Sequence, residues 1–417
     1  MFEVTPRAAE LSSTLTRFLE EDIYPAERAY EEQVKQAGAA RTQPPIMEAM
    51  KAKARTLGLW NLFLPHKEDG HDPLTNLEYA HLAELSGRSL YLAPESMNCA
   101  APDTGNMELL SMFGTAQQKE RWLKPLMKGE IRSAYAMTEP QVASSDASNI
   151  ETTIVRDGEE WVINGRKWWI SGVERERCEL LIVLGITDSN GERHARHTMV
   201  LIPRDAPGIT VERDLTVMGY NPSESHVEMT FDNVRVPANS ILGEVNAGFA
   251  MSQARLGPGR IHHCMRMVGA AERALELMIV RANTRKAFGS ELARQGVIQE
   301  WIADSRVEID QARLYILYTA HLMDTVGNKA AASQISGIKV VAPSMAAKVI
   351  DRAIQLHGAA GLSQDFPLAR MWVETRIIRL ADGPDEVHRR AVARTELRNF
   401  AAAVSPRPTG VKAHLSV

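Results

Sequence analysis

The chain has 417 residues, of which 44% are hydrophobic and 24% charged, and its formal net charge is −4. That length exceeds what one hydrophobic core fills, so it predicts two or three domains. The small net charge provides no general attraction to nucleic acid, and no apolar run approaches the roughly 18 residues of a membrane-spanning helix, so we expect neither nucleic acid nor membrane as a partner.

Residues 1–133 are expected to form an N-terminal helical domain. Apolar side chains recur at helical spacing at Leu11, Leu15, Phe18, Leu19 and Ile23, and Pro25 is expected to end this helix. Another helix is predicted between Thr75, which suits a helix start, and Gly87, which suits a helix end.

Residues 134–243 are expected to form a middle β domain. Apolar and polar residues alternate over 151–172, and further strand-like segments cover 178–188, 197–205 and 226–237. The pairs Asp157-Gly158 and Asn164-Gly165 predict two tight turns within the first segment.

Residues 244–401 are expected to form a C-terminal helical bundle. Long helical patterns cover 254–285, 297–327 and 335–361, with a kink predicted at Pro343, and a last helix follows Pro384. Residues 402–417 are expected to be a loose tail.

Several segments offer groups for a ligand, although local rules explain each one differently. YAMTEPQVASSD (135–146) has hydroxyls and backbone amides, but its spacing alone favours a linker between domains. The two tryptophans of KWWISG (167–172) point to opposite faces of a strand, so one faces a domain interface or a flat ring. RKAFG (285–289) and QLHGAAG (355–361) read locally as helix ends, although Arg285 could meet a phosphate.

Asp382, in RLADGPDEVHRR (379–390), is the candidate base. Asp385 and Glu386 follow Pro384 and are explained by the first turn of a helix, where the helix dipole favours acids. The same rules explain Asp382 less well.

No metal site is predicted. Cys99, Cys178 and Cys264 are far apart and form no CxxC pair, and the adjacent His262 and His263 would diverge by about 100° on a helix. The cysteine usage and the lack of a signal-like start favour a reducing compartment, so we expect a cytoplasmic protein.

In their order, these segments resemble the acyl-CoA dehydrogenase family over roughly residues 5–400. YAMTEPQVASSD is similar to the flavin-loop motif YxxTEPxxGSD, KWWISG to K-x-W-I-T/S-N/G, RKAFG to R-x-x-F-G, and QLHGAAG to Q-x-x-G-G-x-G. ADGPDEVHRRAVAR aligns with the segment that carries a catalytic glutamate in many members. Segments 101–108, 256–266 and 382–388 most resemble family members 10 and 11, in which the base is aspartate, here without the kinase-like domain of some of those members.

The resemblance implies an α+β multidomain fold: an N-terminal helical domain, a middle β-barrel-like domain and a C-terminal four-helix bundle. It implies FAD between the β domain and the bundle, with the adenine end reaching a second subunit of a homodimer or homotetramer. The implied FAD contacts are Ala136, Met137, Thr138, Ser144, Ser145, Trp169, Ser171, Pro384, Asp385 and Glu386, together with Arg285, Gln355, Gly358 and Ala359 toward a neighbouring subunit and Phe288 beneath an aromatic ring. The implied substrate contacts are Ser144, Arg260 and Gly383.

The implied reaction is α,β-dehydrogenation of an acyl-CoA thioester to a 2-enoyl-CoA. Asp382 would remove the α-proton while the β-hydride passes to flavin N5, and electrons would pass to an electron-transfer flavoprotein. Because free aspartate has a pKa of about 3.9, we expect an apolar, water-free environment to raise the pKa of Asp382. The family pattern is broken at Gly257, Gly296, Ala359 and Pro384, and the first of these removes an acid that usually contacts the adenine end of CoA.

Two other functions remain open on the same fold. One is an oxygen-using flavoprotein oxidase, similar to nitroalkane oxidase or acyl-CoA oxidase, which an aspartate base also suits. The other is a flavin-bound protein that binds nucleic acid, which predicts a basic C-terminal face.

Overall fold

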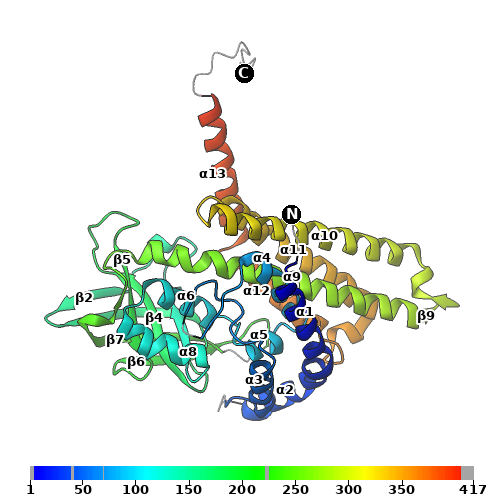
Figure 1. The fold of residues 1–417 in the computed structure, drawn as a ribbon, viewed down its shortest axis with the longest axis horizontal. Helices are drawn as coiled ribbons and strands as arrows, with labels where there is room; N and C mark the ends of the chain where they lie inside the picture. The colour runs from blue at the N-terminus through cyan, green and yellow to red at the C-terminus, as the bar shows by residue number, and fades with distance from the viewer. Residues whose placement is uncertain (1–3, 39–41, 69, 221–224, 405–417) are drawn as a thin grey trace.

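The computed structural model describes residues 4–38, 42–68, 70–220 and 225–404. A β-sheet lies at one end of the molecule, the N-terminal helices lie in the middle, and long helices extend to the other end (Figure 1). Residues 405–417, most of the expected tail, lie outside the described residues.

The N-terminal region is helical, as predicted. Its elements are α1 (Pro6–Phe18), η1 (Leu19–Ile23), α2 (Tyr24–Ala37), α3 (Pro45–Thr56), α4 (Asn76–Gly87), α5 (Leu92–Ser96), α6 (Asp103–Phe113), α7 (Ala116–Gln118), η3 (Lys119–Leu123) and α8 (Lys124–Lys128). The predicted cap at Thr75 is confirmed, because its hydroxyl accepts from Glu78 N–H at 3.1 Å and the Glu78 carboxylate accepts from Thr75 N–H at 2.9 Å.

The predicted helix end at Pro25 is wrong. α1 continues through η1, a π-helical turn, into α2, and Pro25 lies in the first turn of α2. Proline is tolerated there because the first turn of a helix does not need the N–H that proline lacks. The wider π turn that precedes α2 makes this position the start of a new helical segment.

The middle region is an eight-stranded sheet with the order β6-β7-β3-β2-β4-β5-β8, and β1 also pairs with β4. The strands are β1 (Arg132–Ala136), β2 (Thr153–Asp157), β3 (Glu160–Ser171), β4 (Cys178–Ile186), β5 (His197–Pro203), β6 (Ile209–Leu215), β7 (His226–Pro237) and β8 (Ile241–Leu242). β4 pairs in parallel with β1 and β2, and the other pairs are antiparallel.

The two predicted turns have different outcomes. Asp157-Gly158 joins β2 to β3, with Asp157 paired to Glu160. Asn164-Gly165 is not a turn but lies inside β3 at a shift in the register with β7. Glycine is required there because a Cβ at Gly165 would lie 2.4 Å from the hydroxyl of Thr152.

The C-terminal region contains the predicted long helices. Its helices are α9 (Gly248–Thr284), α10 (Gly296–Val326), α11 (Ala332–His357), α12 (Leu368–Ile378) and α13 (Asp385–Val404). α11 runs through Pro343, and the short hairpin β9 (Lys286–Ala287) and β10 (Ser290–Glu291) connects α9 to α10. α13 begins one residue after the predicted start and projects away from the bundle (Figure 1).

The bundle and the N-terminal helices are packed directly against each other. A Cβ at Gly269 of α9 would lie 1.8 Å from the carbonyl oxygen of Glu84 of α4, and one at Gly87 would lie 2.2 Å from that of Arg266. The two glycines therefore allow α4 and α9 to cross in backbone contact, which fixes α9 relative to the rest of the chain.

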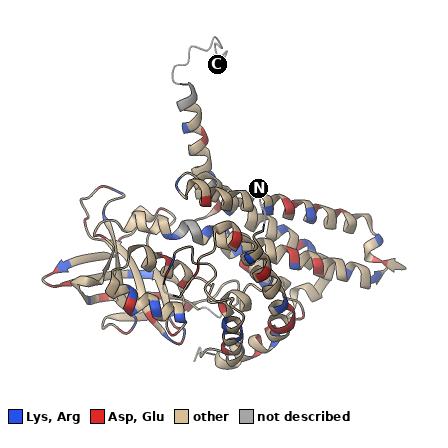
Figure 2. Ribbon diagram, viewed as in Figure 1, with Lys and Arg blue, Asp and Glu red and all other residues tan. Residues whose placement is uncertain are grey.

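Membrane spans, metal clusters and basic surfaces can also be compared with the described residues. Within the described ranges, no helix is long and apolar enough to cross a membrane, and no cluster of three or more His, Cys, Asp or Glu is placed to hold a metal. Basic and acidic residues alternate along the C-terminal helices in the view of Figure 2, in contrast to the basic face that the nucleic-acid alternative predicts.

Candidate active site

The turn between α12 and α13 presents Asp382 in an uncommon backbone conformation. Its φ is +55° and that of Gly383 is +104°, and aspartate tolerates the left-handed region better than most residues do. The carbonyl oxygen of Asp382 accepts hydrogen bonds from Nε of Arg260 at 3.1 Å and from Nε2 of His388 at 3.2 Å. The turn is thus held by α9 on one side and α13 on the other.

Gly383 is needed for the same turn. A Cβ at this position would lie 3.0 Å from Nε2 of His388, in a backbone region that side chains rarely adopt. The Gly383 carbonyl accepts from the buried ammonium of Lys339 at 3.4 Å, and this ammonium also donates to the carbonyl of Ile378. α11 therefore supplies a third support.

The carboxylate of Asp382 is largely shielded and faces α9. Its side chain is 19% exposed, and Oδ2 lies 3.6 Å from Nε2 of His263. The backbone of Gly259 passes beside the carboxylate, because a Cβ there would lie 3.6 Å from Oδ2, in ordinary van der Waals contact.

The prediction that an apolar, water-free environment raises the pKa of Asp382 is wrong. Burial raises this pKa, but His263, Arg255, Arg260 and Lys339 together lower it below the ordinary value of 3.8. The reason is that Arg255, Arg260 and Lys339 are cationic and that His263, whose pKa is about 4, becomes charged in the acid range; together they favour the charged form more than burial disfavours it. The carboxylate is therefore ionised at neutral pH.

Arg255 links this carboxylate to the N-terminal helices. Its guanidinium lies 4.1 Å from the ring centroid of Tyr135, and its Nε donates to Oδ1 of Asn106 at 3.3 Å. Nearby Glu108 is buried with no hydrogen-bond partner among the described residues for either carboxyl oxygen, and burial raises its pKa to about 8 against the charge of Arg255. Glu108 is therefore mainly neutral at pH 7.

The segment that carries Ala136, Met137 and Thr138 is joined to KWWISG by a buried ion pair. Nζ of Lys167, fully buried, donates to Oε1 of Glu139 at 2.8 Å and to the carbonyls of Met137 at 2.9 Å and Leu184 at 2.7 Å. The backbone N–H of Trp168 also donates to the carbonyl of Thr138 at 3.0 Å. Two motifs that the sequence separates thus form one surface.

The two serines of the loop lie differently. The hydroxyl of Ser144 accepts from the N–H of Glu139 at 2.9 Å and lies 3.3 Å from its carbonyl oxygen, so it closes the loop upon itself. Ser145 is exposed. Their predicted contacts with a cofactor or substrate stay predictions.

Trp169 and Ser171 lie at the end of β3, where the register with β7 shifts. Trp169 has a φ of +55° and is 42% exposed, which is unusual for a large aromatic side chain. The hydroxyl of Ser171 lies 2.9 Å from Nδ1 of His226 on β7. Trp169 therefore offers a partly exposed flat ring, with the ring centroids of Trp168 and His226 at 6.1 and 5.8 Å from its own.

The remaining predicted cofactor residues lie in two places. Asp385 is buried and accepts from Nε of Arg379 at 2.8 Å, whereas Pro384 is half-buried and Glu386 exposed. Arg285, Phe288, Gln355, Gly358 and Ala359 are largely exposed near the ends of α9 and α11, and Phe288 is 100% exposed. At about 1.5 Å per residue, the end of α9 lies about 32 Å along the axis from His263, so this group is remote from Asp382 in the same chain.

Residues at the site that the sequence did not predict come from many elements. Lys339 and His388 hold the Asp382 turn, Arg255 and His263 add charge or a titratable ring near it, and Glu139 pairs with Lys167. Glu139, Lys167, His263 and His388 lie within segments that the sequence analysis quotes, but none of them was predicted there as a site residue.

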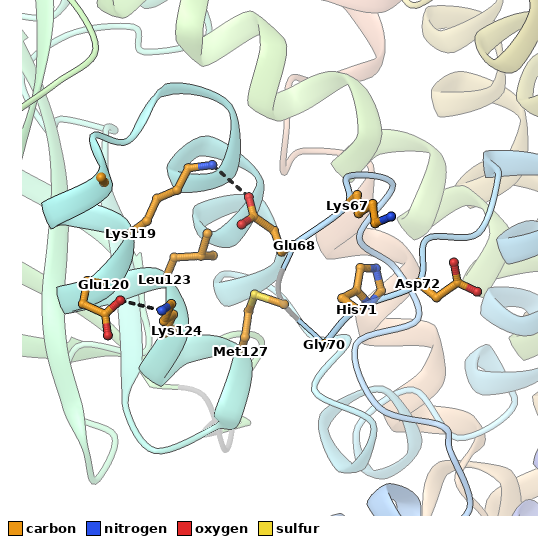
Figure 3. A pocket seen from close by; sticks show the side chains of 11 residues that line it. Lys67, Glu68, Gly70, His71, Asp72, Lys119, Glu120, Leu123, Lys124 and Met127 are labelled. Atoms are coloured by element: carbon orange, nitrogen blue, oxygen red, sulfur yellow. Dashed lines mark hydrogen bonds and ion pairs between the residues drawn. The ribbon is translucent and has the colours of Figure 1, made fainter.

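An open groove elsewhere contains none of the predicted site residues. It measures about 760 Å³ and lies between residues 67–72 and the helices α7, η3 and α8 (Figure 3). Its charged side chains partly neutralise one another, as in the pairs Lys119–Glu68 at 2.9 Å and Lys124–Glu120 at 2.5 Å. The groove therefore does not alter the choice of Asp382 as the candidate centre.

Comparison with known families assigns the chain. Residues 5–130, 134–234 and 246–397 match the N-terminal, middle and C-terminal domains of acyl-CoA dehydrogenase. The chain belongs to the acyl-CoA dehydrogenase family. The predicted fold class is thereby confirmed.

Individual relatives agree with this assignment. A probable acyl-CoA dehydrogenase, FadE2 of Mycobacterium tuberculosis, is 55% identical over 97% of this chain and 100% of its own length. Acyl-CoA dehydrogenase family member 10 of Mus musculus is 54% identical over 97% of this chain, which spans only 38% of that relative. A solved structure from Mycobacterium abscessus, classed with the acyl-CoA dehydrogenases, superposes with a TM-score of 0.90 at 51% identity over 95% of this chain and 100% of its own.

Proposed function

We propose that this protein is an FAD-dependent acyl-CoA dehydrogenase in which Asp382 removes the α-proton of the thioester. The observation that carries the proposal is the Asp382 turn: an ionised, largely shielded carboxylate on a backbone fixed from α9, α11 and α13. A base that must meet one carbon atom needs such a fixed position more than it needs a high pKa.

The backbone around Asp382 suits a thioester carbonyl. Among the described residues, the N–H of Asp382 has no hydrogen-bond acceptor, although its carbonyl has two donors. A free N–H beside the base can stabilise negative charge on the thioester oxygen while the α-proton leaves. Gly383 lies beside this group, and the other proposed substrate contacts are Arg260, which holds the turn, and Ser144.

The chain's residues fit FAD. The exposed face of Trp169 and the hydroxyl of Ser171 lie on the strand joined to Thr138 by a backbone hydrogen bond, and this surface suits a flat polar ring. When bound, FAD supplies the acceptor for the hydride that leaves the β-carbon. We assign the proposed contacts to Ala136, Met137, Thr138, Ser144, Ser145, Trp169, Ser171, Pro384, Asp385 and Glu386.

The exposed group at the far end of the bundle supports an oligomer. Arg285, Phe288, Gln355, Gly358 and Ala359 lie too far along α9 and α11 to share one ligand with Asp382 of the same chain. We therefore propose that they contact FAD of a neighbouring subunit in a homodimer or homotetramer, and that electrons pass to an electron-transfer flavoprotein.

Anaerobic flavin bleaching tests the proposal. A panel of acyl-CoAs is added to wild type, to Asp382→Asn and to the control Asp351→Asn, which changes an exposed aspartate of α11. We expect wild type and control to bleach with at least one thioester and Asp382→Asn to bleach at least about a hundredfold more slowly. Equal rates in all three proteins would remove Asp382 from the mechanism, and rapid reoxidation by air would favour the oxidase.

A further inference from the structure

The two adjacent histidines of α9 have different environments. The buried ring of His262 packs edge-on against Tyr79, with centroids 4.9 Å apart, and against Phe63 at 6.3 Å. His263 points to the other side, where its Nε2 lies 3.6 Å from Oδ2 of Asp382 and its side chain is 21% exposed. Packing therefore accounts for His262 but leaves His263 without an explanation of that kind.

The groups around His263 and Asp382 are mostly cationic. They come from α9, α11, α13 and β1 and comprise Arg255, Arg260, Cys264, Arg266, Lys339, His388 and Tyr135. Burial, Arg266, Lys339 and Arg255 lower the pKa of His263 to about 4, while Asp382 raises it. The imidazole is therefore neutral at neutral pH, and a neutral imidazole has one nitrogen that can accept a proton.

The proton taken by Asp382 has to leave again before the next turnover. A protonated Asp382 is an acid among cations, and those cations favour its return to the carboxylate. His263 is placed to receive this proton because its Nε2 faces the oxygen that would carry it.

We propose that His263 is the second proton carrier of this site and accepts at Nε2 the proton that Asp382 has removed from the substrate. The inference rests on the proposed function. In the first step the α-carbon–hydrogen bond breaks, its electron pair forms the new carbon–carbon double bond as the β-carbon–hydrogen bond breaks, and an O–H bond forms on Oδ2. The hydride from the β-carbon would go to FAD, as in the proposed function. In the second step that O–H bond breaks and an N–H bond forms, which leaves a carboxylate beside an imidazolium.

Solvent exchange distinguishes this relay from a lone carboxyl group. A 3-thia-acyl-CoA has sulfur in place of the β-carbon, so it can lose an α-proton but no β-hydride. With α-deuterium in this analogue, deuterium lost to water is measured by mass spectrometry for the holoenzyme. A change in the flavin spectrum reports α-proton removal and is the second measurement. We expect His263→Gln to slow the loss of deuterium by a factor about ten or more times larger than the factor by which it slows the spectral change.

Two further variants make the result decisive. His388→Gln removes a donor to the Asp382 carbonyl, so we expect it to reduce the spectral change and the exchange together, as any purely positional role would. His321→Gln, on α10, should leave both unchanged. If His263→Gln also lowers the two in equal proportion, or lowers neither, the relay is refuted; if Asp382→Asn still exchanges deuterium, the proposed function itself fails.

A titration without substrate gives an independent measurement. The NMR pKa of His263 in the holoenzyme should fall in Asp382→Asn, because the carboxylate raises that pKa in the wild type. The same pKa in both proteins would show that the two groups do not interact, and would overturn the inference.

Discussion

Replacing Lys167 with methionine should loosen the contact between the sheet and the loop that carries Met137 and Glu139, which is part of the proposed cofactor site. The Lys167 ammonium is fully buried and reaches three oxygen atoms, on Glu139, Met137 and Leu184. Burial lowers its pKa only to about 8, so the ammonium is mainly charged at pH 7. The pKa of Glu139 is lowered as well. Burial raises this pKa, but Lys167 and the backbone N–H donors together lower it by more.

The expected loss of stability follows from the buried groups that lose an ion-pair or hydrogen-bond partner in Lys167→Met. Lys167→Met leaves the carboxylate of Glu139 buried, with the N–H groups of Glu151 and Thr152 as its remaining donors at 2.7 and 2.9 Å. Breaking a buried ion pair in this way costs about 3–5 kcal/mol. Because Met137 lies within the loop that Lys167 holds, FAD affinity should also fall.

Urea denaturation of the apoprotein and FAD titration measure the two effects. The double variant Lys167→Met with Glu139→Gln should be less destabilised than the sum of the singles, because neither charge is then left alone. Arg235→Gln, which breaks an exposed pair with Asp157 in the same domain, is the matched control and should not shift the urea midpoint. A Lys167→Met midpoint equal to that of wild type would refute the reasoning.

Three other predictions follow from particular side chains. The contribution of neutral Glu108 to stability is fully present below pH 4.5 and is lost as pH rises through about 8. The loss is at most about 5 kcal/mol. Glu108→Met should therefore weaken the dependence of the melting temperature on pH between pH 5 and 9. Gly383→Ala should cost about 1–3 kcal/mol in urea denaturation and slow flavin bleaching, because its Cβ would meet His388 in a strained backbone region. Phe288→Ser should weaken FAD binding without lowering the apoprotein monomer's stability, since its side chain is 100% exposed; equal FAD affinity would exclude it from the cofactor site.

Local pattern predicted the elements well because periodicity and caps are local properties. The Thr75 cap is the clearest case, since Glu78 stands only three residues away. Pro25 and Asn164-Gly165 failed because an adjacent π turn and a close approach by Thr152 changed what the same residues do. The π turn lies next to Pro25 but no simple residue rule signals it, and Thr152 lies outside the short window that the turn rule considers.

The candidate site was predicted only in part, for a related reason. Asp382 could be identified because its sequence neighbours explain it poorly, but its pKa depends on residues far away in the chain. Arg260, for example, is 122 positions from Asp382. No spacing rule associates it, His263 or Lys339 with that carboxylate, so sequence reasoning expected an apolar surrounding and predicted the wrong direction for the pKa.

This difference in pKa changes how Asp382 would work as the proposed base. A carboxylate among cations is a weak base before substrate binds, but it is always ionised and needs no deprotonation step first. Covering its remaining 19% exposure with a thioester would remove water and raise its pKa at the moment when it must accept a proton. In the proposed mechanism, the cations would then favour a fast return to the carboxylate, so the same charges that weaken Asp382 as a base would also clear it for the next substrate.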